Sequence, residues 1–167
     1  MSSSNIEFVY KNRIFKIENS DSNETLLNYI RTKLKKIGTK EGCAEGGCGA
    51  CTVVLGELRS NEINYKAINS CISLLPTLQG KQLILVEDLI SEEGSLHPVQ
   101  KAMVDYHGSQ CGFCTPGFIM SLFSMFKKKS KFTEDEIKNT IAGNLCRCTG
   151  YQPIIKAAKS LNNKNKI

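Results

Sequence analysis

Two absences limit what this sequence can be: it has no long hydrophobic run, and we expect no secretion signal from its first residues. The most apolar stretch of the 167 residues, at positions 117–126, is too short to cross a lipid bilayer. The N-terminal segment MSSSNIEF lacks the basic region followed by an apolar stretch that directs secretion. We therefore expect a cytoplasmic protein without membrane contact, in a compartment where cysteine thiols stay reduced.

Recognisable catalytic motifs are also missing. The sequence contains no Gly-x-Gly-x-x-Gly dinucleotide loop, no nucleophile triad and no paired carboxylates in a known motif, so we expect no substrate site in this chain. The formal charge of +6 reflects lysines concentrated at 127–131 and 156–166. Because no aromatic residues interleave with these lysines as a base-stacking surface requires, nucleic-acid binding is not expected.

Cysteine, in contrast, is abundant. The chain has eight, three of them in the glycine-rich stretch EGCAEGGCGACTVV at 41–54. A disulfide knot, a zinc site or an iron–sulfur cluster could explain them, and a reducing compartment disfavours the disulfides. Eight thiolates on two [2Fe–2S]²⁺ clusters would lower the formal charge from +6 to about +2, since ligating thiols are deprotonated.

The first half of the chain predicts strands around one helix. Lys11 and Asn12 join two β-type runs and are typical of a hairpin turn. The predicted strands lie at 6–10, 13–17, 52–55, 63–68 and 83–86. A mixed sheet crossed by one helix, with a metal loop at its edge, is a β-grasp arrangement. We expect it to form a plant-type ferredoxin-like domain over residues 1–88.

The helix of this half is predicted from an apolar stripe. Apolar residues recur at helical spacing from Leu26 to Ile37. Ser22 or Asn23 would cap the start of this helix, and Gly38 would end it.

The second half, residues 89–167, predicts a four-helix domain and makes the whole fold α+β. The helices are expected at 97–107, 116–127, 133–143 and 151–161. Thr133 and Glu136 have the spacing of a capping box, while Gly143 and Gly150 lie where helices would stop. Three phenylalanines are interpreted as core residues: Phe118, Phe123 and Phe126.

Four cysteines of the first half form one quartet. Cys43, Cys48 and Cys51 have the C-x₄-C-x₂-C spacing of plant-type [2Fe–2S] ferredoxins, and Cys71 is the remote fourth ligand. A loop around a cluster needs positive φ angles and backbone N–H groups close to sulfur, which glycine supplies. Zinc sites more often use pairs of C-x₂-C knuckles, so this quartet favours the cluster.

The second quartet is ambiguous from its spacing. Cys111 and Cys114 form a C-x₂-C motif, and Cys146 and Cys148 form a C-x-C motif, both at helix ends. Four thiolates of this kind can hold either zinc or an iron–sulfur cluster. A redox dithiol at Cys111 and Cys114 is a further alternative, although that motif normally belongs near a βαβ unit.

Three longer motifs resolve this ambiguity by resemblance. GCAEGGCGACTV at 42–53, QCGFCTPG at 110–117 and GNLCRCTGY at 143–151 resemble the iron–sulfur subunits of the molybdenum hydroxylases. This family includes xanthine dehydrogenase, aldehyde oxidase and carbon monoxide dehydrogenase. The resemblance extends over nearly the whole chain.

The resemblance implies two [2Fe–2S] clusters, one in each quartet. The helical quartet, Cys111, Cys114, Cys146 and Cys148, would receive electrons from a molybdenum–pterin cofactor. The first quartet would pass them to FAD. Gln110 and Cys148 match positions that contact the molybdopterin. The resemblance implies no catalytic residue in this chain. The partners would be a molybdenum-cofactor large subunit and an FAD-binding subunit or domain, in a hetero-oligomer.

Within the family, the stretch at 96–109 resembles the xanthine dehydrogenases most. The same role in an aldehyde oxidase or another family member is the alternative, and a zinc-stabilised interaction scaffold is an alternative of a different class. His97 and His107 are interpreted as structural helix-end residues, because each quartet is complete without them. Since many xanthine dehydrogenases continue into a flavin domain, a chain ending at Ile167 implies a separate flavin subunit or a fragment.

Overall fold

A five-stranded mixed sheet forms the first half of the molecule. The computed structural model describes residues 3–163. The strands are β1 (Ser3–Tyr10), β2 (Arg13–Asp21), β3 (Thr52–Arg59), β4 (Glu62–Asn69) and β5 (Gln82–Ile84). Their order is β2-β1-β5-β3-β4, in which only the β1–β5 pair is parallel. The predicted mixed sheet is confirmed, with each of the first four strands longer than expected.

Two tight hairpin turns set the register of the outer strand pairs. Lys11 and Asn12 both have positive φ angles (48° and 58°), as do Ser60 and Asn61 (48° and 64°). Two consecutive residues with positive φ characterise the type I′ turn, whose twist suits a two-residue hairpin. The predicted hairpin at Lys11 and Asn12 is therefore confirmed.

The helix of the sheet half, α1 (Leu26–Thr32), is shorter than predicted, and its predicted cap was wrong. Thr25 is the N-cap, and its hydroxyl accepts a hydrogen bond from the Asn28 N–H. The chain leaves the helix after Thr32 and reaches a positive φ of 55° at Lys35. Gly38 does not end a helix; its N–H donates to the Glu87 carboxylate at 2.8 Å.

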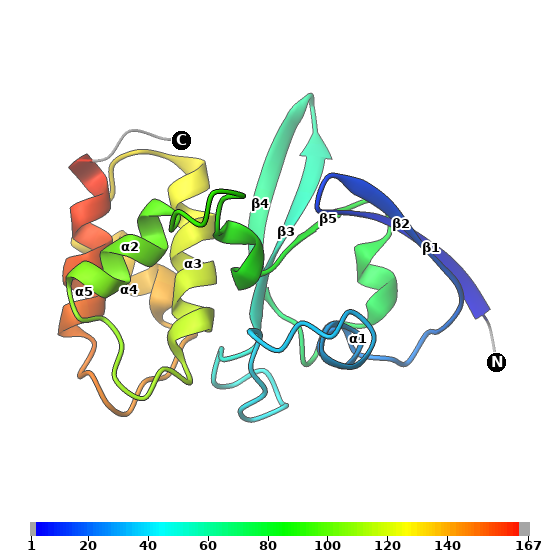
Figure 1. Ribbon diagram of the computed structural model, residues 1–167, viewed down its shortest axis with the longest axis horizontal. Coiled ribbons are helices and arrows are strands. Elements are labelled where there is room, and N and C mark those ends of the chain that lie inside the picture. The colour runs from blue at the N-terminus through cyan, green and yellow to red at the C-terminus, as the bar shows by residue number, and fades with distance from the viewer. Residues whose placement is uncertain (1–2, 164–167) are drawn as a thin grey trace.

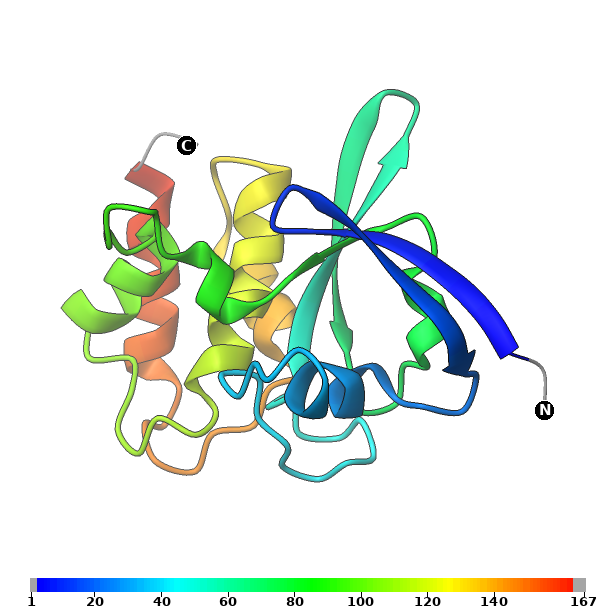
Figure 2. The same cartoon turned by 45° about the vertical axis from the view of Figure 1, so that its right-hand side comes forward.

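Four helices make up the second half, as predicted. They are α2 (Pro98–Asp105), α3 (Thr115–Lys128), α4 (Glu134–Ile141) and α5 (Gln152–Ser160). Figures 1 and 2 show them gathered on one side of the sheet half, with α3 nearest to β3 and β4. Gly143 follows the end of α4, but the prediction for Gly150 was wrong: it lies in the loop before α5, with a φ of 64°.

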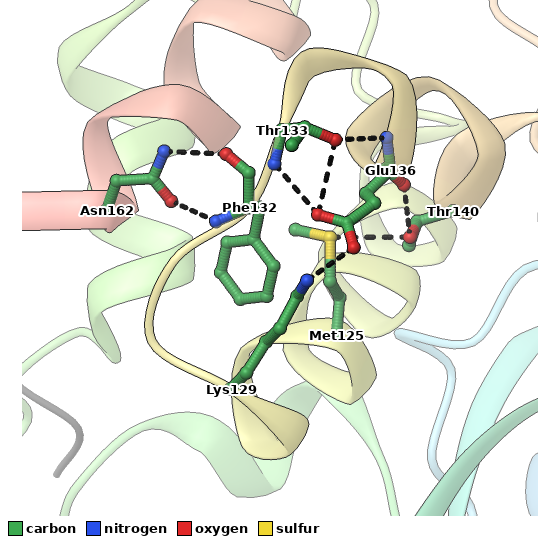
Figure 3. Close-up of polar contacts among 7 residues, drawn as sticks. All are labelled: Met125, Lys129, Phe132, Thr133, Glu136, Thr140 and Asn162. Atoms are coloured by element: carbon green, nitrogen blue, oxygen red, sulfur yellow. Dashed lines mark hydrogen bonds and ion pairs between the residues drawn. The ribbon is translucent and has the colours of Figure 1, made fainter.

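The start of α4 is the predicted capping box (Figure 3). The Thr133 hydroxyl accepts from the Glu136 N–H at 3.2 Å, and the Glu136 carboxylate accepts from the Thr133 N–H at 2.8 Å. Lys129 forms an ion pair with the other carboxylate oxygen of Glu136. Just before the cap, the Asn162 amide holds both backbone groups of Phe132. These contacts fix the α3–α4 connection against the C-terminal end of the helical half.

Buried apolar side chains form two main clusters joined near β3. The first lies between the sheet and α1, and the second among the four helices. Phe118, Phe123 and Phe126 are buried in the helical cluster, which confirms them as core. Val54 of β3 also belongs to it. The boundary predicted between residues 88 and 89 falls inside the 3₁₀ helix Val86–Leu89, and it stays a prediction.

His97 has the structural role expected of it. It caps α2 by accepting the Val99 N–H at its Nδ1 atom (3.2 Å), and its ring packs edge-on against Phe123 and Phe126. Burial, with Lys127 nearby, lowers the pKa of His97 to about 4. His107 follows the end of α2 with a φ of 54°, so it too lies at a helix end.

Within residues 3–163, the helices are all too short or too polar to cross a membrane.

Candidate metal centres

Three cysteine-bearing loops lie at one end of the molecule. In both views the loop at 38–51 and the loops at 106–114 and 142–151 extend to the same side (Figures 1 and 2). The eight cysteines are all free thiols. Each predicted quartet is brought together, and within each quartet the thiols meet in two pairs.

Cys51 and Cys71 are the inner pair of the first quartet. Their sulfur atoms lie 3.3 Å apart, and both residues are buried beside Leu27. Burial, followed by the neighbouring Cys51 thiol, raises the pKa of Cys71 to about 11. A metal bound here must therefore displace a tightly held proton, which its charge readily does.

Cys43 and Cys48 are the outer pair. The backbone N–H of Cys43 donates to the Cys48 sulfur at 3.4 Å, and the Gly47 N–H donates to the Cys43 sulfur at 3.2 Å. Hydrogen bonds from the Glu45 backbone and the Cys48 thiol lower the pKa of Cys43 to about 7. The loop thus stabilises a thiolate with its own amides, as a cluster-binding loop requires.

Two glycines explain how the loop can wrap so closely. Gly46 has a φ of 81°, which L side chains rarely adopt. A Cβ atom on Gly42 would lie 2.7 Å from the Cys48 sulfur. No sequence motif points to Asn69, whose side-chain amide donates to the Gly46 carbonyl at 2.7 Å and ties the loop to β4.

The second quartet has the same paired arrangement. The Cys114 thiol neighbours Cys146, and the Cys148 thiol neighbours Cys111. Burial, followed by Cys146, raises the pKa of Cys114 to about 12. The outer pair, Cys111 and Cys148, is exposed, and the Cys111 thiol raises the pKa of Cys148.

Cys146 is held by Thr149 and Tyr151, two residues that the cysteine spacing does not single out. Burial opposes its ionisation, but the Thr149 hydroxyl, 3.2 Å from the sulfur, and backbone amides outweigh burial and lower the pKa of Cys146. The Cys146 N–H donates to the Tyr151 hydroxyl at 2.9 Å. Both residues belong to the third motif, so they could have been found there.

Gln110 is exposed and directly precedes Cys111. Because Cys111 lies beside Cys148, the two residues predicted to contact a pterin are on the exposed side of the second quartet.

The two quartets are linked through the backbone. The Leu145 N–H donates to the Cys48 carbonyl at 2.9 Å. Cys48 is a member of the first quartet, and Leu145 lies directly before a cysteine of the second. One hydrogen bond therefore joins a residue of the first quartet to the residue preceding Cys146. Sequence spacing gave no sign of this contact.

The donor chemistry fits two-iron clusters. A [2Fe–2S] cluster takes four thiolates, two at each iron, which matches thiols that meet in pairs. Among residues 3–163, no group of three or more His, Cys, Asp or Glu side chains is placed around a point that could hold a single ion. Cys43, Cys48, Cys51 and Cys71 would hold one cluster, and Cys111, Cys114, Cys146 and Cys148 the other.

Two family models match the chain. Residues 9–75 match a 2Fe-2S iron-sulfur cluster binding domain, and residues 85–159 match a [2Fe-2S] binding domain.

Known proteins match along almost the whole chain. A xanthine dehydrogenase from Blastobotrys adeninivorans is 48% identical over 149 residues, covering 87% of this chain and 10% of that protein. Aldehyde oxidase 1 from Oryctolagus cuniculus is 43% identical over 142 residues, covering 84% and 11% respectively. This chain thus spans about a tenth of the length of these curated relatives.

The fold also matches solved structures. A chain of quinoline 2-oxidoreductase from Pseudomonas putida superimposes with a TM-score of 0.80 at 30% identity. The match covers 96% of this chain and 94% of that one.

Proposed function

Because this chain belongs to the iron–sulfur subunits and domains of the molybdenum hydroxylases, we propose that it relays single electrons from a molybdenum–pterin site to a flavin. The paired arrangement of the thiols in both quartets is the observation that carries this proposal. When bound, a [2Fe–2S] cluster accepts and donates one electron. All eight cysteines are used as ligands, four for each cluster.

The residues around the thiols set the conditions for this transfer. Amide donors from the loop at 42–47 point at the sulfurs of the outer pair of the first quartet. Such hydrogen bonds stabilise the more negative, reduced charge and raise a cluster's potential. Burial of Cys51 and Cys71 acts in the opposite direction by disfavouring added charge.

The second quartet is the entry point for electrons. Cys111 and Cys148 are exposed beside Gln110, so a partner's pterin can approach them directly. The contact between Leu145 and Cys48 then gives a short route to the first quartet. A molybdenum-cofactor subunit and an FAD-binding subunit or domain would be the partners.

Xanthine dehydrogenase is the favoured enzyme, with an aldehyde oxidase as the second candidate. The identities to xanthine dehydrogenases, from 44% to 49%, are slightly above the 43% to the aldehyde oxidase and support this order. The substrate itself would bind in a partner, since this chain carries no catalytic motif.

The test is electron paramagnetic resonance of the dithionite-reduced chain, with iron and zinc measured on the same sample. Two distinct [2Fe–2S] signals and about four irons per chain are expected, because two quartets take two irons each. A single signal together with bound zinc would assign the second quartet to a structural zinc site. A colourless, zinc-loaded chain without signals would support the interaction scaffold instead.

A further inference from the structure

A buried amide outside both quartets connects their loops. Asn144 is only 3% exposed, although it lies in the loop that leads to Cys146. Its Nδ2 atom donates to the Gly49 carbonyl at 3.0 Å and lies 3.3 Å from the Thr52 hydroxyl. Its Oδ1 atom accepts from the Ser121 hydroxyl of α3 at 2.7 Å. One side chain thus contacts the first cysteine loop, the start of β3 and the helix α3.

The neighbouring residue repeats the contact with the backbone. Leu145 donates its N–H to the Cys48 carbonyl, while Asn144 donates its amide to the next carbonyl, that of Gly49. Two consecutive residues of one loop therefore hold two consecutive carbonyls of the other. This register fixes the loop before Cys146 against the loop that carries Cys48.

Around Asn144, the backbone of the two loops and of α3 is packed too closely for a further side chain to fit between them. A Cβ atom on Gly49 would lie 2.3 Å from the Gly143 carbonyl oxygen, and one on Gly117 would lie 2.2 Å from the Gly49 carbonyl oxygen. The two loops and the start of α3 are thus in direct backbone contact. An asparagine suits this position because it supplies a donor and an acceptor, and an unsatisfied buried polar group is costly.

We propose that Asn144 is a positioning residue that locks the two cysteine loops in register and so maintains the Cys48–Leu145 link between the clusters. The inference rests on the proposed function, because the link matters only if both quartets hold clusters. Asn144 touches neither quartet's sulfur atoms in any hydrogen bond of the described residues. Its effect is on how the two sites are coupled.

The first readout is amide hydrogen exchange at Leu145 in the cluster-loaded full chain. Asn144→Ala and Asn144→Asp both remove the amide donor to Gly49. We expect the Leu145 N–H to exchange about tenfold faster, which corresponds to about 1.4 kcal/mol of lost local protection. Asn162→Ala is the matched control, since it removes a comparable amide clamp on Phe132 away from the cysteine loops. It should leave Leu145 exchange unchanged.

The second readout is the magnetic interaction between the two reduced clusters. The Asn144 variants should weaken this interaction while keeping both cluster signals and the iron content. Unchanged exchange at Leu145 together with an unchanged interaction would overturn the inference. If Asn144→Ala fails to load iron, Ser121→Ala is the variant that tests the inference, because it removes one hydrogen-bond partner of the same Asn144 amide. Faster Leu145 exchange in it supports the inference, and wild-type exchange overturns it.

These outcomes are separate from the fate of the proposed function. A wild-type chain without two cluster signals refutes the relay itself. Two signals in the wild-type chain, with Asn144 variants that behave like it, refute only the role of Asn144.

Discussion

At the scale of single residues, the two cysteines that are exposed allow the quartets to be tested separately. Cys111→Ser or Cys148→Ser should reduce the iron content from about four to about two per chain, because one quartet is incomplete. The signal of the first cluster should persist, since its ligands and loop amides all lie between residues 43 and 71.

Cys51→Ser is the reciprocal control, and it should remove the first signal while leaving the second. Loss of both signals in either variant would refute independent assembly of the two clusters. The measurement is electron paramagnetic resonance with iron quantification on the same preparations.

His97 makes stability depend on pH. Its pKa is lowered from 6.5 to about 4 in the folded chain. Between pH 6.5 and pH 4, His97 therefore binds a proton in the unfolded chain but not in the folded chain. The contribution of His97 to the unfolding free energy is full above pH 6.5 and decreases as the pH falls toward 4. Protonation also removes the Nδ1 acceptor that caps α2.

We expect His97→Asn to flatten the decrease in unfolding free energy between pH 6.5 and 4, because asparagine still caps the helix without titrating. His107→Asn, at a helix end with a positive φ that asparagine tolerates, is the control and should keep the wild-type slope. Denaturant unfolding at several pH values is the measurement. Identical slopes for wild type and His97→Asn would contradict the assignment.

At the scale of elements, the cap of α4 is a local feature that the sequence predicts fully. The T-x-x-E spacing predicts the Thr133–Glu136 box, and both of its hydrogen bonds form. Thr133→Ala should lower the unfolding free energy by about 1 kcal/mol, because it leaves a helix N–H without a partner. Thr133→Ser keeps the hydroxyl and should cost much less. Chemical denaturation of the two variants checks this, and equal losses would count against the cap.

The approach of α3 to the first cysteine loop predicts unequal effects for two glycines. Gly117→Ala should lower the unfolding free energy by about 1 to 3 kcal/mol, because its Cβ would collide with the Gly49 carbonyl. Gly143→Ala should be tolerated, since its Cβ would meet no atom within 4 Å and its φ is not positive. Thermal unfolding and iron content measure both, and equal tolerance would contradict the close contact.

Local signals predicted most elements, whereas long-range contacts decided the exceptions. The hairpin at Lys11 and Asn12 depends on neighbouring residues and was predicted correctly. The apolar stripe toward Ile37 predicted too long a helix. Arg31 instead donates to the carbonyls of Ile37 and Thr39, six and eight residues further on, and Glu87, 49 residues away, accepts from the Gly38 N–H. Side-chain contacts, one of them long-range, therefore replace the last helical turns.

The residues of the candidate sites also fall into two groups: those predicted from local sequence and those brought together by long-range contacts. The grouping of the eight cysteines into two quartets comes from the sequence: spacing predicts the first quartet, and the resemblance of the longer motifs implies the second. The Asn69, Asn144 and Leu145 contacts join segments that are distant in sequence. No local pattern encodes such contacts; they arise only when the sheet and the helices pack together.

At the scale of the whole molecule, the exposure of the thiols predicts an order of metal loss. Cys111 and Cys148 are exposed, whereas Cys51 and Cys71 are buried. A chelator should therefore remove iron from the second quartet faster than from the first. Following the two cluster signals over time in excess chelator measures this order. Equal rates, or faster loss from the first quartet, would contradict it.

The Asn144–Gly49 contact also has a consequence for synthesis on the ribosome. The two residues are 95 positions apart. At about 5 to 20 residues per second, roughly 5 to 20 s pass between the synthesis of the first cysteine loop and that of the residue that fastens it. During this interval the loop's thiols are made but the helical half against which it docks is not, so the first site can be filled before residue 144 fastens it to that half.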